Sequence, residues 1–165
     1  MIKVSEINIY PVKSLGPINK SNIQVQSQGL AGDRCYMLVD QNNQFITQRK
    51  HPKLALVSVK ETSEFLTINA PNMPELNVNK KTHFNFQRHS NLLKVNLWSD
   101  ICSALSADDN INQWFSEYLK FNVLMVSYDY DNPRQADPLF SRETDTVSFA
   151  DGFPILLISQ ASLND

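Results

Sequence analysis

Three short segments, far apart in the chain, carry residues that could bind an anion. Tyr-Pro-Val-Lys-Ser at residues 10–14 and Gly-Leu-Ala-Gly-Asp-Arg at residues 29–34 each place a cation beside a turn built on Pro or Gly. An anion site requires fixed positive charge beside backbone that a ligand can approach closely. The third segment runs from Phe-Ala-Asp-Gly-Phe-Pro at residues 149–154 to Ser-Gln-Ala-Ser at residues 159–162. Its hydroxyl residues stand where we expect a helix to begin, and the N–H groups of a helix start also attract anions.

Each basic residue in these segments has an alternative, structural role. Lys13 could hold a phosphate or another anion as a point charge, helped by the Ser14 hydroxyl, or it could be an exposed lysine at a strand end. Arg34 could bind a phosphate through two parallel hydrogen bonds while Asp33 orients it, or the two could form an ion pair at a structural turn. Arg-Lys-His-Pro-Lys at residues 49–53 could be a solvated turn or an electropositive rim for an anionic ligand.

The composition limits the class of protein. The chain has 165 residues, of which 42% are hydrophobic and 19% charged, enough for one domain with a core or one domain plus the start of another. A net charge of −2 and a pI near 5.9 argue against a nucleic-acid-binding face. No apolar run reaches the length of a membrane span, and the first residues lack the apolar centre of a signal peptide. We therefore expect a cytoplasmic protein that binds neither nucleic acid nor a membrane.

The cysteines and histidines do not form a metal-binding pattern. Cys35 and Cys102 stand far apart, and His51, His83 and His89 are scattered at spacings unlike those of metal ligands. Free cysteine is among the residues most often buried. We therefore predict two buried thiols in strands and no self-contained metal site.

The first 100 residues have the short, evenly spaced apolar segments of a β-rich domain. Residues 35–39 and 45–47 flank the polar turn at residues 40–43 and predict a hairpin. Strands this short and regular favour a barrel or a sandwich. The full set of predicted strands covers residues 4–9, 23–25, 35–39, 45–47, 54–59, 65–68, 76–78 and 92–98.

The spacing of apolar residues also predicts one amphipathic helix near residues 107–120. Ser106 and Asp109 resemble a capping box at its start, with Asp in place of the usual Glu. The apolar positions repeat at the spacing of one helix face, and we interpret them as a core-facing stripe rather than a cofactor site. These positions are Ile111, Trp114, Phe115, Tyr118 and Leu119.

The chain after this helix alternates between apolar and polar segments. Residues 123–126 predict a strand, and residues 128–146 predict a long loop, which in a compact protein is usually functional or mobile. Residues 155–158 are apolar at successive positions, as in a strand buried on both faces. Ser159 could cap a helix that begins at Gln160.

The segments at residues 10–14 and 29–34, together with others along the chain, resemble the N-terminal part of MOSC-domain proteins. This family includes the mitochondrial amidoxime-reducing component and bacterial proteins with a ferredoxin-like tail. The resemblance covers nearly the whole chain and keeps its order, and it rests on several motifs rather than on one. It continues through Phe-Ile-Thr-Gln-Arg-Lys-His-Pro-Lys-Leu at 45–54, Val-Asn-Leu-Trp-Ser-Asp at 95–100, the helix with Trp114, and residues 149–163.

The resemblance implies a fold, a cofactor and a reaction. The fold is mainly β with some α, an α+β arrangement in which a barrel-like N-terminal domain (residues 1–127) precedes a loop and the beginning of the MOSC core (residues 128–165). The cofactor is the molybdenum cofactor (molybdopterin), a pterin that carries a phosphate, and the reaction is the reduction of N-hydroxylated substrates. The positions that match the cofactor contacts of the family are Lys13, Ser14, Arg34, Ser159, Ala161 and Ser162.

One departure from the family pattern bears on catalysis. The cysteine that ligates molybdenum in the family lies beyond the position matching Asp165, and neither Cys35 nor Cys102 stands at a matching position. We therefore expect a chain truncated from a longer polypeptide, which alone binds no cofactor and is inactive. The expected partners of the longer protein are the remainder of its MOSC domain and an electron donor such as a ferredoxin-like protein.

The alternative is a non-catalytic β-barrel module. It would recognise a substrate or a partner that carries sulfur or pterin, and it would perform no chemistry of its own. We favour the oxidoreductase interpretation because of the ordered series of motifs and the apolar strand and helix start near residue 165.

Overall fold

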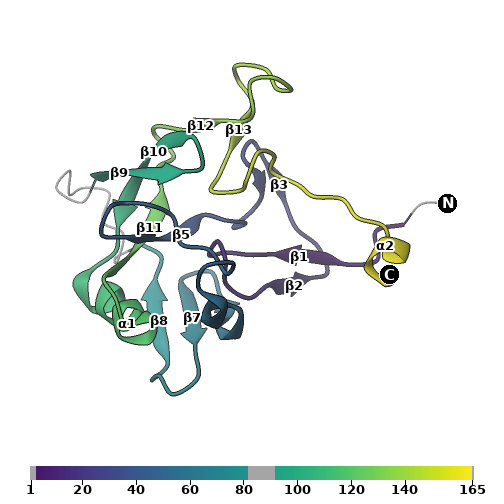
Figure 1. The fold of residues 1–165 in the computed structure, drawn as a ribbon. Helices are drawn as coiled ribbons and strands as arrows, with labels where there is room; N and C mark the ends of the chain where they lie inside the picture. The colour runs from purple at the N-terminus through teal and green to yellow at the C-terminus, as the bar shows by residue number, and fades with distance from the viewer. Residues whose placement is uncertain (1–2, 82–91, 165) are drawn as a thin grey trace.

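The computed structural model describes residues 3–81 and 92–164, and this part of the chain is mainly β (Figure 1). The principal sheet is antiparallel and has the strand order β5-β11-β10-β9. It comprises β5 (Tyr36–Asp40), β9 (Leu92–Leu97), β10 (Asp100–Ser106) and β11 (Val123–Tyr128). A second sheet comprises β6 (Ser58–Glu61), β7 (Phe65–Asn69) and β8 (Leu76–Asn79).

Three separate two-stranded sheets accompany these two sheets, and the helices are short. The pairs are β1 (Ile7–Ile9) with β2 (Ile18–Lys20), β3 (Val25–Gln26) with β4 (Gly29–Leu30), and β12 (Arg134–Gln135) with β13 (Thr146–Val147). The helices are α1 (Asp109–Leu119), α2 (Gln160–Asn164) and the 3₁₀ helix η1 (Pro52–Leu56). The β-rich class that the sequence predicts is therefore confirmed.

The principal sheet is buried on both faces. Leu38 and Met125 face a core shared with α1 and the second sheet, whereas Met37 and Val126 face a second cluster that includes Phe149. Consecutive residues of a strand point to opposite faces, so Met37 and Leu38 enter different clusters. This double burial explains why β5 is a continuous apolar run.

Helix α1 confirms the predicted amphipathic helix. Its side chains Ile111, Trp114, Phe115 and Tyr118 are buried in the core. The predicted capping box is wrong, because Ser106 is the last residue of β10 and the N-cap is Asp108, whose side chain makes no capping hydrogen bond.

Residues 54–59 do not form the single strand that their apolar pattern predicts. Pro52 instead begins the 3₁₀ helix η1, and the strand β6 starts only at Ser58. Proline fixes φ near the helical value and needs no hydrogen-bond acceptor in the first turn, so a helix start suits it. The predicted hairpin around residues 40–43 forms a turn, with the Asn43 N–H donating to the Asp40 carbonyl at 2.9 Å. Its returning arm makes isolated bridges, Phe45 with Val39 and Gln44 with Asn96, rather than a strand.

The segment after β13 also differs from the prediction. Residues 155–158 form no strand, and Leu156 and Leu157 are 79% and 89% exposed, so the predicted buried strand is wrong. A strand exists through hydrogen bonds to a neighbour, and within the described part of the chain no neighbour pairs with this segment. The helix predicted at Gln160 is confirmed, and the Ser162 N–H donates to the Ser159 Oγ at 3.1 Å, as in an N-cap.

The predicted loop at residues 128–146 is partly ordered by the pairing of β12 with β13. Residues that follow this pair return to the principal sheet, because the Phe149 N–H donates to the Arg34 carbonyl at 3.0 Å. In residues 3–81 and 92–164, no helix is long and apolar enough to cross a membrane.

Candidate anion-binding site

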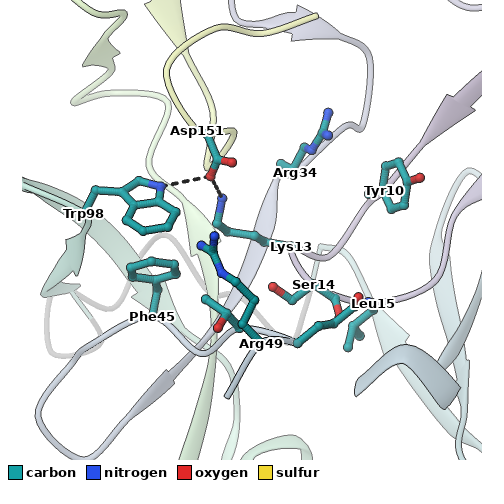
Figure 2. Close-up of a pocket in the computed structure, with 11 residues that line it drawn as sticks. Tyr10, Lys13, Ser14, Leu15, Arg34, Phe45, Arg49, Trp98 and Asp151 are labelled. Atoms are coloured by element: carbon teal, nitrogen blue, oxygen red, sulfur yellow. Dashed lines mark hydrogen bonds and ion pairs between the residues drawn. The ribbon is translucent and has the colours of Figure 1, made fainter. Parts of the chain in front are cut away.

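A polar pocket of about 260 Å³ collects side chains from five separate segments of the chain. It opens between the residues that follow β1, the turn that carries Arg34, the segment after residue 44, the turn between β9 and β10, and residue 151 (Figure 2). Three cations line it against one carboxylate. The cations are Lys13, Arg34 and Arg49, and the carboxylate is Asp151.

Backbone pairing with the start of β5 positions Lys13. The Lys13 N–H donates to the Tyr36 carbonyl at 2.8 Å, and Val12 forms a parallel bridge with Tyr36. The side chain is buried, and its Nζ donates to the Phe149 carbonyl at 2.8 Å and to Asp151 Oδ1 at 2.7 Å. Burial lowers the pKa of Lys13 below its ordinary value despite the opposing effect of Asp151. The exposed-lysine alternative is therefore wrong, because this ammonium is desolvated and donates to two acceptors.

Arg34 is held by the turn that its sequence motif predicts. Gly32 has φ +80°, a left-handed conformation that glycine adopts without strain. The buried Asp33 carboxylate pairs with the Arg34 guanidinium and also accepts the Tyr10 N–H at 2.7 Å. Asp33 therefore orients the arginine and ties the turn to β1, which combines the two roles considered for it. The guanidinium carbon lies 5.1 Å from the centre of the Tyr10 ring, in cation–π geometry.

Three residues that line the pocket have left-handed backbone conformations. Ser14 has φ 70°, Arg34 has φ 49° and Trp98 has φ 57°. Residues other than glycine pay a conformational cost in this region, and such residues cluster at functional sites, where the surrounding structure holds them. The carbonyl of Ser14 is fixed in this way, because it accepts a hydrogen bond from Gln48 Nε2 at 2.9 Å.

Asp151 and Trp98 belong to the pocket but are absent from the set of site residues predicted from the sequence. Trp98 lies at the tip of the β9–β10 hairpin, and its Nε1 donates to Asp151 Oδ1 at 2.9 Å. Burial tends to raise the pKa of Asp151, but hydrogen bonds from Lys13 and Trp98 outweigh it and hold that pKa below its ordinary value. Figure 2 shows Lys13 and Trp98 both directed at this carboxylate. Both residues lie within motifs of the family resemblance, which is the one signal that could have found them.

Aromatic rings and a third cation complete one wall of the pocket. The rings of Phe45 and Trp98 lie 4.7 Å apart, and the Arg49 guanidinium carbon lies 5.0 Å from the centre of the Trp98 ring. Arg49 has no ion-pair partner within the described ranges, unlike Lys13 and Arg34. Of the two roles considered for the basic cluster at residues 49–53, this geometry favours an electropositive rim.

The structure does not bring all the predicted site residues together. Lys13, Ser14 and Arg34 line the same pocket, although they come from two segments. Ser159, Ala161 and Ser162 lie in or next to the exposed helix α2, on the far side of the molecule from β9 and β10 (Figure 1).

The two cysteines lie outside this pocket and are buried, free thiols, as predicted. The prediction that both lie in strands is wrong for Cys35, which precedes β5, and is confirmed for Cys102 in β10. Burial raises the pKa of both Cys35 and Cys102, which disfavours the reactive thiolate. No group of three or more His, Cys, Asp or Glu side chains that could hold a metal ion occurs in the described part of the chain. Of the three histidines, His83 and His89 lie outside the described residues.

Known proteins resemble this chain over nearly its whole length. Mitochondrial amidoxime reducing component 2 of Rattus norvegicus is 29% identical over 172 residues, which cover 98% of this chain and 50% of that protein. Component 1 of Homo sapiens is 27% identical (98% of this chain, 49% of that protein), and component 1 of Danio rerio is 25% identical (98% and 51%). The chain thus spans about half the length of these curated relatives.

A solved structure and a family model agree with this likeness. The solution structure of a protein from Bordetella bronchiseptica matches with a TM-score of 0.55 at 15% identity, over 76% of this chain and 90% of that one, and so shares its fold. Residues 1–122 match the family model of the MOSC N-terminal beta barrel domain. This chain therefore belongs to the MOSC family and carries its N-terminal beta barrel domain.

Proposed function

We propose that this chain is the N-terminal part of a molybdenum-cofactor-binding MOSC oxidoreductase that reduces N-hydroxylated substrates. Its role is to hold the phosphate and pterin of the cofactor. The observation that carries the proposal is the convergence of Lys13, Ser14 and Arg34 on one pocket, from segments separated by some 20 residues of chain. These are residues that the family resemblance assigns to the cofactor, and the polar, cationic pocket suits an anion.

The donors in the pocket fit a phosphate group better than a bare metal ion. Lys13 supplies a buried point charge, and Arg34 supplies a planar guanidinium already oriented by Asp33. Because burial and ion pairing have fixed these groups before a ligand arrives, little side-chain entropy is lost on binding. Among the residues that the structure describes, the pocket offers one carboxylate and no thiol or imidazole, which is the chemistry of an anion site.

The division of labour follows from this chemistry. The molybdenum cofactor, when bound, supplies the redox chemistry, and the protein supplies binding, orientation and electrostatics. In this chain Arg34 and Lys13 would neutralise and orient the phosphate, and Ser14, whose backbone is left-handed, lines the same pocket. The rings of Phe45 and Trp98 exclude water from one side.

The proposal extends to the C-terminal segment and to partners. We assign residues 1–127 to the barrel domain and residues 128–165 to the start of the MOSC core. In the complete protein, Ser159, Ala161 and Ser162 would add contacts to the cofactor, and the remainder of the MOSC domain would cover residues 155–158. A ferredoxin-like protein or another donor would supply electrons, and the protein would be cytoplasmic.

The first test uses the natural protein purified from its source. We expect about one molybdenum per chain by elemental analysis, and an intact mass above the 18.8 kDa of these 165 residues. A protein of 18.8 kDa without molybdenum would contradict the proposal. That result would support the alternative of a non-catalytic binding module.

Substitution of Arg34 then tests the pocket itself. Arg34→Ala should weaken cofactor retention by roughly 1.5–3 kcal/mol, about 10- to 150-fold, because it removes charge-assisted hydrogen bonds. Arg34→Lys keeps a cationic partner for the buried Asp33, so this variant should remain stably folded. It should still lose cofactor affinity, because a lysine cannot form the two parallel hydrogen bonds of a guanidinium. The comparison therefore separates weaker cofactor binding from loss of folding. Arg142→Ala, an exposed arginine outside the pocket, is the matched control. Full molybdenum content in both Arg34 variants would show that the assigned role is wrong.

A further inference from the structure

One carboxylate in the pocket already occupies the place where an anion would meet Lys13. The Asp151 Oδ1 accepts hydrogen bonds from Lys13 Nζ at 2.7 Å and from Trp98 Nε1 at 2.9 Å. The Asp151 side chain is 70% exposed, whereas that of Lys13 is 10% exposed. The carboxylate is therefore the more exposed partner of this ion pair, and Figure 2 shows it in contact with both Lys13 and Trp98.

We propose that Asp151 is a built-in competitor for anions, which exchanges with a phosphate at Lys13 and thereby sets the anion affinity of the pocket. This inference rests on the proposed function and deepens it, because it names a regulating residue of the same site. It follows from electrostatics that a fixed carboxylate beside an anion site weakens binding of a second negative charge. When the phosphate displaces that carboxylate, the repulsion between the two anions is removed, and the phosphate replaces the carboxylate as the partner of Lys13.

The framework around Asp151 stays in place while its carboxylate moves. The Arg134 guanidinium donates to the backbone carbonyls of Asp151 at 2.5 Å and Ala150 at 2.8 Å. Lys13 keeps its second acceptor, the Phe149 carbonyl, at 2.8 Å. Only the exposed Asp151 side chain therefore has to rotate, a motion that surface side chains complete within nanoseconds.

The charges of the pocket favour this exchange over simple addition of an anion. Arg34 is neutralised by Asp33, and Lys13 by Asp151, so Arg49 is the one pocket cation without an ion-pair partner in the described residues. Of the two paired carboxylates, Asp33 is 3% exposed and fixed, whereas Asp151 is free to leave. Its departure makes the pocket more positive at the moment when a phosphate enters.

The exchange has an optical signature. Trp98 loses its hydrogen-bond acceptor when Asp151 rotates away, and its indole is half-exposed, while the other tryptophan, Trp114, is buried in the core and donates to the Pro74 carbonyl. Phosphate binding should therefore change the emission of Trp98 and leave that of Trp114 unchanged. Trp98→Phe should remove the signal, because Trp114 does not report on the pocket.

The experiment measures inorganic phosphate binding to the natural protein made in a host that lacks the cofactor. Calorimetric titrations at constant ionic strength compare wild type with Asp151→Asn, Arg34→Lys and Glu143→Gln. Glu143 is exposed and outside the pocket, so its variant removes the same charge elsewhere. We expect Asp151→Asn to bind phosphate about two- to fivefold more tightly, the range for release of a partly exposed ion pair, and Glu143→Gln to change binding by less than about 1.5-fold.

The outcomes separate this inference from the proposed function. In one outcome, phosphate binds wild type, binds Arg34→Lys more weakly, and binds Asp151→Asn no more tightly than wild type. This result overturns the competitor role of Asp151 and leaves the proposed anion pocket intact. Binding without a change in Trp98 emission also overturns the exchange, because the anion would then add beside Asp151. Both proposals are overturned if phosphate binds none of these proteins, or if it binds wild type and Arg34→Lys with the same affinity.

Discussion

At the scale of single residues, the pocket is organised by two ionised side chains with opposite solvent exposure. Lys13 is buried, and burial lowers its pKa, whereas Asp151 is mostly exposed and has a lowered pKa because hydrogen bonds from Lys13 and Trp98 outweigh its partial burial. The buried Lys13 ammonium thus needs its hydrogen-bond acceptors to remain charged, whereas the exposed Asp151 carboxylate can be solvated by water when it leaves its donors. This asymmetry makes the aspartate the movable partner.

The lowered pKa of Asp151 predicts a pH dependence of stability. Because the folded pKa lies below the unfolded one, ionised Asp151 stabilises the fold above pH about 4 and loses this contribution as the pH falls through the folded pKa. The contribution should stay under about 1 kcal/mol, since the side chain is largely exposed. Urea unfolding at pH 7 and pH 3 should show a smaller loss of stability for Asp151→Asn than for wild type. An equal loss in both proteins would mean that the ion pair contributes nothing to the fold.

At the scale of elements, Arg134 joins the segment that carries Asp151 to the β9–β10 hairpin. From β12 its guanidinium donates to Asp100 Oδ2 at 2.7 Å and to the buried carbonyls of Ser148 at 3.0 Å and Ala150 at 2.8 Å. Trp98 approaches the same Asp151 from the tip of that hairpin. One arginine therefore holds together the elements from which two pocket residues come.

Removing this arginine should destabilise the fold and disorder the pocket. Arg134→Ala leaves buried carbonyls without donors, and we expect it to lower the free energy of unfolding by about 2–4 kcal/mol. Chemical denaturation measures the loss, with Arg142→Ala as a control that should change stability by less than about 0.5 kcal/mol. Arg134→Lys should recover part of the loss, because an ammonium has three donors but lacks the planar fork. Equal stability of Arg134→Ala and the control would show that the hydrogen bonds are not maintained in solution.

At the scale of the whole molecule, the sequence predicts elements well where one periodic pattern dominates. Helix α1 and the strands β7 and β9 follow from their apolar spacing, because each has one buried face. Strand β10 (Asp100–Ser106) was not predicted, since it lies between β9 and β11 and is buried over four successive residues. Alternation disappears in such a strand.

The candidate site could be predicted only as far as local motifs reach. Lys13 and Arg34 each carry their signal in a neighbouring Pro or Gly turn. The contacts that complete the pocket join Asp151 to residues 138 and 53 positions away in sequence, and nothing in the local pattern encodes such distances. The exposure of residues 155–158 is likewise a property of the tertiary arrangement, because their composition predicts burial.

This exposed segment supports a prediction for the complete protein. Leu156, Leu157 and Ile158 are 79%, 89% and 56% exposed, and a contiguous apolar patch of this kind marks an interaction surface more often than single exposed side chains do. If the remainder of a MOSC domain covers it, Leu157→Asp buries a charge and should destabilise the natural protein by more than about 2 kcal/mol. Leu56→Asp, which alters an exposed leucine of η1, should change stability by less than about 0.5 kcal/mol.

Thermal and chemical unfolding of the two variants of the natural protein decides between the two functions considered for this chain. Destabilisation confined to Leu157→Asp means that further protein packs on residues 155–158, as the oxidoreductase proposal requires. Equal, small effects mean that the segment stays in solvent. The chain would then present an open apolar surface, as expected of a binding module that meets its partner only transiently.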